Sequence, residues 1–207
     1  MRYYKIPNET IRRLPTYLRA LMIASQQGRE EISSQELAEL LTVKSTQIRK
    51  DFSFFGDFGK RGVGYSIEGL AMQIRKILRL QGVRKAALVG VGNLGSAVLA
   101  YPGFKVYGFD IAAAFDCDRK KIGKKVKHIT IEDVSSITML KKQKIDIGII
   151  AVPENAAQQT ADALIKAGVK GILNFSPCYI EVPRNIKVIT IDIATDLARL
   201  SYYMPAR

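Results

Sequence analysis

Apolar residues near the start of the chain recur with the period of an α-helix. Spacings of three and four residues place five of them on one buried face: Ile11, Leu14, Leu18, Leu21 and Met22. This pattern predicts a helix from about Asn8 to Gln26. Further along, Ser33 and Glu36 stand three residues apart, as in a capping box, and predict a second helix that continues through Leu41.

A short turn and a third helix follow. The turn is residues 42–44, and the next helix contains Gln-Ile-Arg-Lys-Asp at residues 47–51. Two short helices joined by a tight turn form the helix-turn-helix arrangement. In that arrangement the second helix lies in the major groove of DNA, with its N-terminal residues at the base edges. The first part of the chain is therefore expected to contain a DNA-binding domain.

The segment after the third helix is rich in glycine and carries positive charge. Residues 56–65, GDFGKRGVGY, contain four glycines, which exclude a helix and favour a tight hairpin. Lys60 and Arg61 lie near its expected tip, where they suit contact with the DNA backbone or minor groove, as in a wing. Alone, the pair would fit a solvated turn, but its position after a basic helix favours DNA binding. Four phenylalanines beside it are spaced as domain core rather than as base-stacking aromatics: Phe52, Phe54, Phe55 and Phe58.

Beyond residue 82 the pattern changes to short apolar runs separated by helical stretches. The runs are residues 86–89, 111–115, 145–152, 171–173 and 188–191. Strands that alternate with helices predict a parallel sheet with right-handed crossovers. The expected fold is α/β. It comprises a winged helix-turn-helix domain over residues 1–82, a doubly wound Rossmann domain over residues 83–190, and a C-terminal segment at residues 191–207.

The first apolar run leads into a glycine-rich loop. Residues 90–95 read GVGNLG, a G-x-G-x-x-G sequence that follows an expected strand and begins an expected helix. In a dinucleotide-binding fold, Gly90 would permit the tight turn, Gly92 the approach of a pyrophosphate, and Gly95 the close packing of helix on strand. Free N–H groups at the start of the helix would hold the phosphates.

A dinucleotide site of this kind also needs an acidic residue about 20 positions further on. Asp116 ends the second apolar run, 21 residues after Gly95. Its carboxylate would accept from the adenosine ribose and repel a 2′-phosphate, which favours NADH and NAD⁺ over the phosphorylated forms. Asp110 is a poorer candidate because it precedes the expected strand. The basic run at residues 119–127 would fit a 2′-phosphate, but we interpret it first as a solvated surface.

Charge and composition favour a nucleic-acid partner and exclude several other classes. The 207 residues carry a net charge of +13, which favours a polyanion. Residues 1–82 hold 14 basic and 8 acidic side chains and the remainder 18 and 11, so charge alone does not locate the contact. Cys117 and Cys178 form no metal motif, and we expect two reduced thiols and no metal. With neither a secretory signal nor a membrane-length apolar stretch, we expect a cytoplasmic protein without a membrane partner.

The acid–base residues that a nicotinamide-dependent enzyme needs are poorly represented. The single histidine, His128, lies in an expected edge strand or loop. Tyr101 and Lys105 have the Y-x-x-x-K spacing of short-chain dehydrogenases, but Pro102 and Gly103 break the helix that would align them. We therefore predict a sensor rather than an enzyme. An NAD-dependent oxidoreductase with an accessory helical domain is the alternative, and a non-specific basic nucleic-acid binder is a second one.

Five stretches carry a family resemblance over essentially the whole chain. They are QIRKDFSFFGDFGKRGVGY at 47–65, GVGNLG at 90–95, GFDIAAAFDCD at 108–118, AVP at 151–153 and NFSPCYIEVP at 174–183. With these stretches the sequence resembles the Rex family of bacterial redox-sensing repressors. The resemblance implies a homodimer that binds a palindromic double-stranded DNA operator and releases it when NADH binds, with NAD⁺ competing for the same site.

The resemblance also implies roles for particular residues. DNA contacts would come from Lys44, Ser45, Gln47, Arg49, Lys50, Lys60 and Arg61. Nucleotide contacts would come from Gly90, Val91, Gly92, Asn93, Leu94, Gly95, Tyr101, Asp116, Ala151, Val152, Pro153, Asn174 and Phe175. In this second set the loop would hold the pyrophosphate, Asp116 the adenosine ribose, and residues 151–153 and 174–175 the nicotinamide side. Tyr101 would report which nicotinamide is bound. Lys44 stands where the family often has a serine cap, so Ser45 is expected to cap the recognition helix instead.

The last residues have the pattern of one amphipathic helix. Ile193, Leu197, Leu200 and Met204 are spaced four, three and four apart, which makes one apolar stripe. In the Rex family such a helix is exchanged between subunits and packs between the partner's two domains. The resemblance therefore implies exchange in a dimer, and packing on the chain's own Rossmann domain is the alternative.

Overall fold

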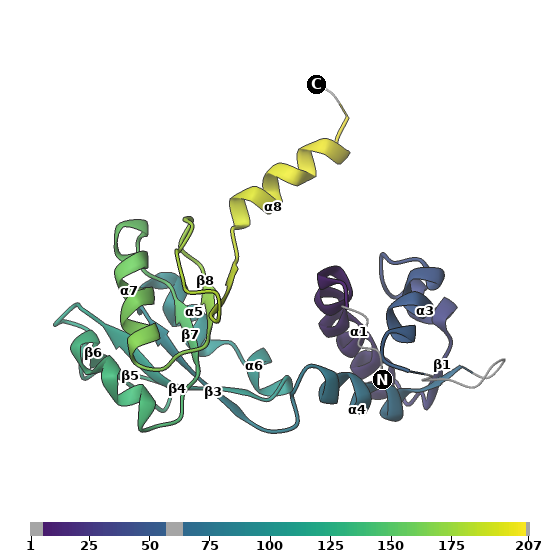
Figure 1. Ribbon diagram of the computed structural model, residues 1–207, viewed down its shortest axis with the longest axis horizontal. Coiled ribbons are helices and arrows are strands. Elements are labelled where there is room, and N and C mark those ends of the chain that lie inside the picture. Colours follow the sequence, from purple (N-terminus) through teal and green to yellow (C-terminus); the bar gives the residue numbers. More distant parts are fainter. Residues whose placement is uncertain (1–5, 57–63, 206–207) are drawn as a thin grey trace. The chain divides into compact units, whose positions relative to one another are not determined.

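The chain folds as two compact units, each with its own hydrophobic core. The computed structural model describes residues 6–56 and 64–205, and its division falls between Met1–Gly82 and Val83–Arg207. Figure 1 shows both units and labels most of their helices and strands.

The N-terminal unit is helical, with one small antiparallel sheet. In chain order its elements are α1 (Asn8–Gln26), β1 (Glu31–Ile32), α2 (Ser34–Glu39), α3 (Ser45–Ser53), β2 (Tyr65–Ser66) and α4 (Ile67–Ile77). β1 and β2 pair antiparallel, with Glu31 opposite Ser66. The strand that follows the glycine-rich segment therefore pairs with the segment between α1 and α2. The predicted tip of the wing, with Lys60 and Arg61, lies outside the described residues.

Helix α1 is the centre of this unit's core. Leu14, Leu18 and Leu21 are fully buried, as their spacing predicts, whereas Ile11 is 37% exposed. Helix α4 packs against α1 and was not among the three predicted helices. Its buried face follows the same helical spacing and consists of Ile67, Leu70 and Ile74.

The starts of α2 and α3 differ in how they are capped. The predicted capping box is confirmed, because Ser33 Oγ accepts from the Glu36 N–H at 3.1 Å and the Glu36 carboxylate accepts from the Ser33 N–H at 2.7 Å. Helix α3 begins at Ser45, with Lys44 at the N-cap position and no side-chain cap bond. The prediction that Ser45 caps this helix is therefore wrong: Ser45 is already helical.

The C-terminal unit alternates strands and helices. Its elements are β3 (Arg84–Val89), α5 (Asn93–Ala100), α6 (Gly103–Val106), β4 (Phe109–Asp116), β5 (Lys125–Val126), β6 (Ile129–Asp133), the 3₁₀ helix η1 (Val134–Lys141), β7 (Ile147–Ile150), α7 (Glu154–Lys166), β8 (Gly171–Asn174), β9 (Lys187–Thr190), α8 (Ile193–Leu200) and the 3₁₀ helix η2 (Ser201–Tyr203). The five predicted strands are present. β5 and β6 are additional. Because β4 begins at Phe109, Asp110 lies inside it, and the prediction that Asp110 precedes the strand is wrong.

These strands form one sheet in the order β5-β6-β4-β3-β7-β8-β9. All neighbours are parallel except β5 and β6. The chain starts in the centre at β3, builds one half through β4 and β6, and returns to start the other half at β7. The strand order reverses between β3 and β7, which is the topological switch point of a doubly wound sheet. The predicted α/β fold with a Rossmann sheet is confirmed.

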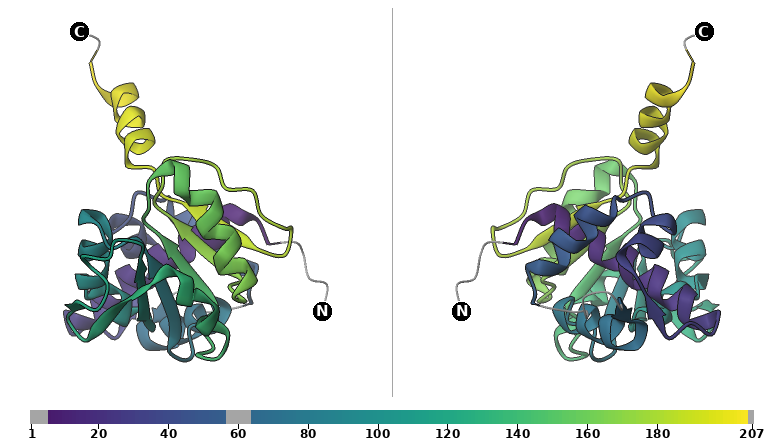
Figure 2. Two further views of the ribbon diagram at one scale, coloured as in Figure 1. Left: turned by 90° about the vertical axis from the view of Figure 1, so that its left-hand side faces the viewer. Right: turned by 90° about the vertical axis from the view of Figure 1, so that its right-hand side faces the viewer.

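Alternate residues of the central strand supply two cores, one on each face of the sheet. Val89 belongs to a core with Leu164 of α7, and Figure 2 shows α7 lying across that face. Leu88 belongs to the other core, with Val98 of α5. The carboxyl end of β3 is thereby held rigidly between layers, at the point where the glycine-rich loop begins.

The C-terminal helix α8 presents an apolar face to solvent. Ile193, Leu197 and Leu200 are 69%, 66% and 55% exposed, and no residue of α8 is buried. Three of the four residues of the predicted stripe are therefore present on α8, whereas Met204 lies beyond the end of the helices, and the stripe does not pack on the chain's own Rossmann sheet.

Neither a membrane-spanning helix nor a metal-binding cluster is found within residues 6–56 and 64–205. No helix in these ranges is long and apolar enough to cross a bilayer. No group of three or more histidine, cysteine or acidic side chains in them is placed to hold a metal ion. Cys117 is exposed and Cys178 is partly buried, and both are free thiols.

Candidate functional site

The loop between β3 and α5 requires glycine at two positions. Gly90 has φ +95°, and a Cβ there would lie 2.4 Å from the Ala151 carbonyl oxygen. A Cβ on Gly95 would lie 1.9 Å from the Gly90 carbonyl oxygen, because α5 packs directly on the loop. At Gly92, by contrast, a Cβ would meet nothing within 4 Å, so this side of the loop is open to a ligand. Gly90 and Gly95 thus have the roles that their spacing predicts, a tight turn and close packing of the helix, and the approach of a pyrophosphate at Gly92 stays a prediction.

The first turn of α5 offers backbone donors on that open side. Gly92 is the N-cap residue, and no side chain caps the helix. The N–H groups at a helix start, together with the helix dipole, favour an anion such as phosphate. Leu94, in the same turn, is 42% exposed.

A cavity of about 840 Å³ opens at the carboxyl ends of β3, β4 and β7. Its volume lies in the range of roughly 300–1,000 Å³ that is typical of small-molecule and cofactor sites. The predicted residues that line it are Gly90, Gly92, Asp116, Ala151, Val152 and Pro153. The other predicted nucleotide residues, all within the described part of the chain, lie outside its lining: Val91, Asn93, Leu94, Gly95, Tyr101, Asn174 and Phe175.

Asp116 lies at the carboxyl end of β4, where its spacing from the glycines places it, and it is almost fully buried. Its Oδ2 accepts from the Val91 N–H at 2.8 Å and from Lys121 Nζ at 3.0 Å. Its Oδ1 accepts from the Asp118 N–H at 2.9 Å. A carboxylate has about four acceptor positions. Oδ1 therefore retains room for one further donor, such as a sugar hydroxyl.

The electrostatic environment keeps Asp116 ionised. Burial alone would raise the pKa of this carboxyl, but the hydrogen bonds from the Asp118 N–H, Lys121 and the Val91 N–H outweigh burial and hold the pKa below its usual value. The same hydrogen bonds tie the glycine loop, through Val91, to the end of β4. Asp116 therefore has a structural function in shaping the cavity in addition to any contact with a ligand.

Asn174 supports the side of the cavity that lies at the carboxyl end of β7. It is fully buried, and its side-chain amide donates to the backbone carbonyls of Ser176 and Cys178, each at 3.0 Å. Ser176 Oγ in turn donates to the Val152 carbonyl at 2.6 Å. This network fixes the loop after β8 against the end of β7, so Asn174 positions the predicted nicotinamide side from within.

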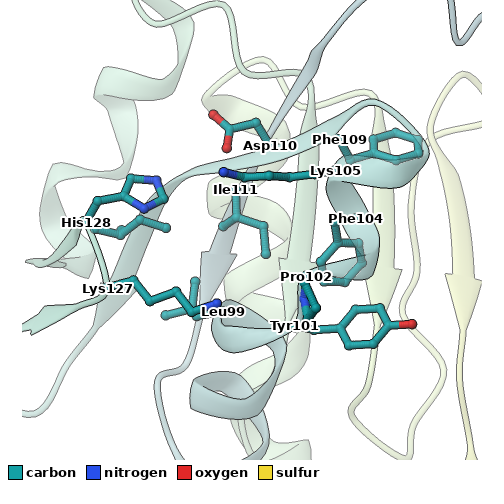
Figure 3. A pocket seen from close by; sticks show the side chains of 11 residues that line it. Leu99, Tyr101, Pro102, Phe104, Lys105, Phe109, Asp110, Ile111, Lys127 and His128 are labelled. Carbon is teal, nitrogen blue, oxygen red and sulfur yellow. The ribbon is translucent and has the colours of Figure 1, made fainter.

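Tyr101 lies outside this cavity, at the end of α5. It is the C-cap residue of α5, whereas Lys105 belongs to the separate helix α6, so the two side chains are not aligned on one helix. The Tyr101 ring packs edge-on against Phe104, with 5.4 Å between ring centroids, and its hydroxyl points outward in Figure 3. The broken Y-x-x-x-K pattern predicted from Pro102 and Gly103 is thus confirmed.

Several cavity residues are not in the predicted set. They are Val89, Cys117, Asp118, Lys121, Val134, Ser135, Ile137, Ala156, Gln159, Thr160 and Ala163. Lys121 belongs to the basic run interpreted as a solvated surface, so that interpretation is wrong for this residue. The residues of η1 follow β6. Recognition of β6 by its alternating pattern, Ile-Thr-Ile-Glu-Asp, would have placed η1 at the same edge of the sheet.

Helix α3 presents a polar face to solvent. Thr46, Arg49 and Lys50 are exposed, and Arg49 Nη1 donates to Ser34 Oγ of α2 at 2.8 Å. Of the predicted DNA residues, Lys44 and Ser45 begin this helix, and Gln47 lies at the border between its exposed and buried faces. Thr46 is absent from the predicted set, although the helical period places it between Arg49 and Lys50 on the outward face.

The buried face of α3 is anchored by a carboxylate. The Asp51 side chain is 0% exposed and accepts hydrogen bonds from three α1 side chains: Thr10 at 3.0 Å, Arg13 at 2.6 and 2.8 Å, and Tyr17 at 2.6 Å. Gln47 Nε2 also donates to it, at 2.9 Å. Burial acts to raise the pKa of Asp51, but these hydrogen bonds prevail and bring it to about 2. The orientation of α3 on α1 is thereby fixed by one buried ionic network.

A helix-turn-helix unit with an exposed polar second helix, joined to a Rossmann sheet with a glycine loop at its switch point, defines a class: DNA-binding regulators with a dinucleotide-binding domain. Two family models agree with this division. The model described as putative DNA-binding protein N-terminus matches residues 5–53, and the model described as CoA binding domain matches residues 83–178.

The chain belongs to the Rex family of redox-sensing transcriptional repressors. It is 43% identical over 199 residues to the redox-sensing transcriptional repressor Rex of Chloroflexus aurantiacus, covering 96% of this chain and 94% of the relative. Identity to the Rex protein of Lactobacillus gasseri is 42%, covering 97% of this chain and 94% of the relative. The relatives are named as repressors and not as enzymes, so the prediction of a sensor rather than an enzyme is confirmed.

Solved structures give the same result. A crystal structure of RSP in complex with β-NAD⁺ and operator DNA matches with a TM-score of 0.90 and 36% identity, covering 97% of this chain and 93% of that one. A structure of RSP in complex with β-NADH matches with a TM-score of 0.87 and 35% identity, covering 97% and 94%. A further structure describes RSP as a Rex-family repressor.

Proposed function

We propose that this protein represses transcription as a homodimer that holds a palindromic DNA operator through its N-terminal units and releases it when NADH binds the Rossmann unit. NAD⁺ competes for the same site without causing release. The observation that carries the proposal is the open glycine loop at the switch point, in a chain that also presents a basic recognition helix. A dinucleotide site and a DNA-reading helix in one chain are what a nucleotide-responsive repressor needs.

The residues around the cavity at the glycine loop fit a dinucleotide. Gly92 leaves open space beside the loop, and the uncapped first turn of α5 offers N–H donors to a pyrophosphate. Asp116 Oδ1 keeps one acceptor position for a ribose hydroxyl, and its negative charge repels a 2′-phosphate. Lys121, which contacts the same carboxylate, reduces that repulsion. NADH and NAD⁺ supply the redox information, because they differ in the nicotinamide ring.

DNA contact is assigned to the outward face of α3 and its start. Arg49 and Lys50 suit phosphates or guanine edges, and Thr46 is small enough to approach a base or a thymine methyl. Lys44 and Ser45 lie at the N-terminal end, which points into the major groove in helix-turn-helix proteins. Lys60 and Arg61 complete the proposed surface as a wing.

The exposed face of α8 supports a homodimer. A short helix with an apolar stripe open to water gains stability by burying that stripe, at about 25 cal/mol per Å². In the proposed dimer each α8 is exchanged and packs on the partner chain. We place the dimer in the cytoplasm, where operator DNA and nicotinamide nucleotides are both present.

Release requires only that NADH prefer one of two dimer states. In the DNA-binding state, the two α3 helices match two half-sites one helical turn apart. A change of the angle between subunits alters that spacing, so both helices no longer fit at once. A tenfold shift in DNA affinity needs about 1.4 kcal/mol of differential NADH binding.

Fluorescence anisotropy on a palindromic DNA, selected by the protein from a random library, tests the proposal. NADH, NAD⁺ and NADPH are titrated separately at fixed salt, because salt alone changes DNA affinity. We expect release by micromolar NADH, with little effect of NAD⁺ or NADPH. DNA affinity that is equal with saturating NADH and with none would refute the sensor role.

A variant with a blocked glycine loop serves as the matched control. Gly95→Ala places a methyl group against the Gly90 carbonyl and leaves the N-terminal unit unchanged. This variant should bind the same DNA and fail to release it with NADH. If NADH releases the variant from DNA as readily as it releases the wild type, the glycine loop is not the sensing site.

A further inference from the structure

A second, smaller cavity lies in the Rossmann unit and shares no lining residue with the cavity at the glycine loop. It lies beside the first residues of β4, whereas Asp116, at the other end of that strand, borders the larger cavity. Its apolar wall includes Leu99 of α5, Phe104 of α6 and Ile111 of β4 (Figure 3). The two cavities are therefore separate sites on one sheet.

Four ionisable side chains from three segments converge on this cavity. They are Lys105 of α6, Asp110 of β4, and Lys127 and His128 of the turn between β5 and β6. In Figure 3 the ends of Lys105, Asp110 and His128 lie on one side of the cavity, and Lys127 reaches across toward Leu99. Two amines and an imidazole against one carboxylate favour a ligand with negative charge.

The size of the cavity limits the ligand. Its volume is about 160 Å³. At roughly 30 Å³ for each water in the liquid, this corresponds to about five water molecules. It is well below the range of about 300–1,000 Å³ for drug-sized pockets, so a nucleotide is excluded. Of the apolar wall, the Phe104 ring is partly exposed and would be left uncovered by a bare inorganic ion, so the ligand needs a short apolar body as well as its charge.

We propose that this cavity binds a small organic carboxylate with a short apolar body. The carboxylate lies at Lys105, Lys127 and His128, and the body packs on the partly exposed ring of Phe104. Such a ligand places its charge beside three donors and covers the exposed part of the apolar wall. Two kinds of molecule meet this description. One is a simple carboxylic acid, and the other is an apolar amino acid, whose ammonium group would lie beside Asp110.

Occupancy of the cavity acts on the end of α5. Lys127 Nζ donates to the carbonyl oxygen of Ala100, the last residue of α5, at 2.6 Å. The Lys127 ammonium has three N–H donors, and a bound carboxylate takes one of them in a stronger bond than the one to the neutral carbonyl, which shifts the ammonium that holds Ala100. Tyr101, the next residue, lines the same cavity. We infer that the carboxylate shifts the NADH response, an inference that rests on the proposed function.

Proton NMR of His128 tests binding directly. It is the only histidine in the chain, so after removal of any histidine tag its imidazole gives a single reporter signal. We expect a saturable shift of this signal when sodium isovalerate is added at constant pH and ionic strength. The midpoint, which is the ligand concentration at half-saturation, should be higher for isoamyl alcohol and for phosphate. Tighter binding of leucine than of isovalerate identifies an amino acid as the source, and the reverse identifies a simple acid.

Matched lysine variants connect the signal to this cavity. Lys127→Gln and Lys105→Gln, on different elements, should each raise the isovalerate midpoint about tenfold, the effect of losing one charge-assisted contact. Lys125→Gln, in the same hairpin but outside the cavity lining, should leave the midpoint unchanged. The absence of a saturable shift with isovalerate and leucine, or equal midpoints in wild type and both cavity variants, overturns the binding proposal. So does phosphate binding as tightly as isovalerate.

The effect on sensing is measured in the anisotropy assay. Saturating isovalerate should change the NADH midpoint for DNA release at least twofold in wild type and not in Lys127→Gln. An unchanged midpoint in wild type overturns the inferred effect on α5. Failure of NADH to release DNA in the isovalerate-free control contradicts the proposed function and this effect together, while carboxylate binding is judged by the His128 signal alone.

Discussion

Replacement of Asp51 by asparagine tests how the recognition helix is held. Asp51 is fully buried beneath α3 and accepts from Thr10, Arg13 and Tyr17 of α1 and from Gln47 of its own helix. Asparagine has nearly the same volume, but its side chain carries no charge and presents an NH₂ group to donors. One oxygen of the network is lost, and the Arg13 guanidinium loses its counter-charge.

The pKa of Asp51 indicates the size of the effect. Its shift from 3.8 to about 2 corresponds to roughly 2–3 kcal/mol, at 1.36 kcal/mol per unit. Removal of one partner of a buried ion pair costs about 3–5 kcal/mol. We therefore expect Asp51→Asn to lose about 3 kcal/mol, which lowers the Tm of a unit this small by roughly 15 °C.

The same pKa gives the direction of the pH dependence. A carboxyl whose folded pKa lies below its unfolded value stabilises the fold at pH values above the unfolded pKa. In wild type this stabilisation is complete above about pH 4 and is lost as the pH falls toward the folded value of about 2. Asp51→Asn should lack the part of the acid-dependent loss that comes from residue 51, whereas the part from other carboxyls with a lowered pKa, such as Asp116, remains.

Urea unfolding of the full chain, followed by circular dichroism between pH 2 and 7, measures both effects. Glu9→Gln is the matched control, because Glu9 pairs with Arg12 on the exposed face of α1 and should change stability little. DNA affinity of Asp51→Asn should also fall, since α3 loses its fixed orientation. An Asp51→Asn protein as stable as wild type at pH 7 would refute the reasoning that this network holds the helix.

Three further changes test separate parts of the molecule. Gly95→Ala, whose methyl group would collide with the Gly90 carbonyl, should weaken NADH binding at least tenfold in a fluorescence titration; unchanged affinity would contradict the close packing of α5. Leu197→Asp places a charge on the exposed stripe of α8 and should convert a dimer to monomer in sedimentation, so a persistent dimer would exclude that stripe as the interface. Lys50→Ala removes a charge from the outward face of α3 and should lower the salt slope of DNA binding by about one, whereas an unchanged slope would show that Lys50 touches no phosphate.

Features that depend on neighbouring residues could be predicted from the sequence alone. The period of α1, the capping box at Ser33 and the glycine loop could each be recognised, because each is set by contacts within a few residues along the chain. The position of Asp116 followed from the same rules, since a strand of known start and a helix of ordinary length fix where the next strand ends. Helix α4 and strand β6 carry equally local patterns, so their omission from the predicted elements does not reflect a missing signal.

Contacts between side chains far apart in the sequence could be recognised only from the folded chain. Asp51 lies 34–41 residues from its α1 partners, and nothing in the spacing of Thr10, Arg13 and Tyr17 indicates a shared carboxylate. The hydrogen-bond partners of Asp116 could not be recognised from their spacing either. The same is true of the convergence of Lys105, Asp110 and Lys127 on one cavity. Local periodicity is fixed by backbone geometry, but the meeting of distant side chains depends on how helices pack and in which order strands pair. The packing of the whole sheet selects these arrangements.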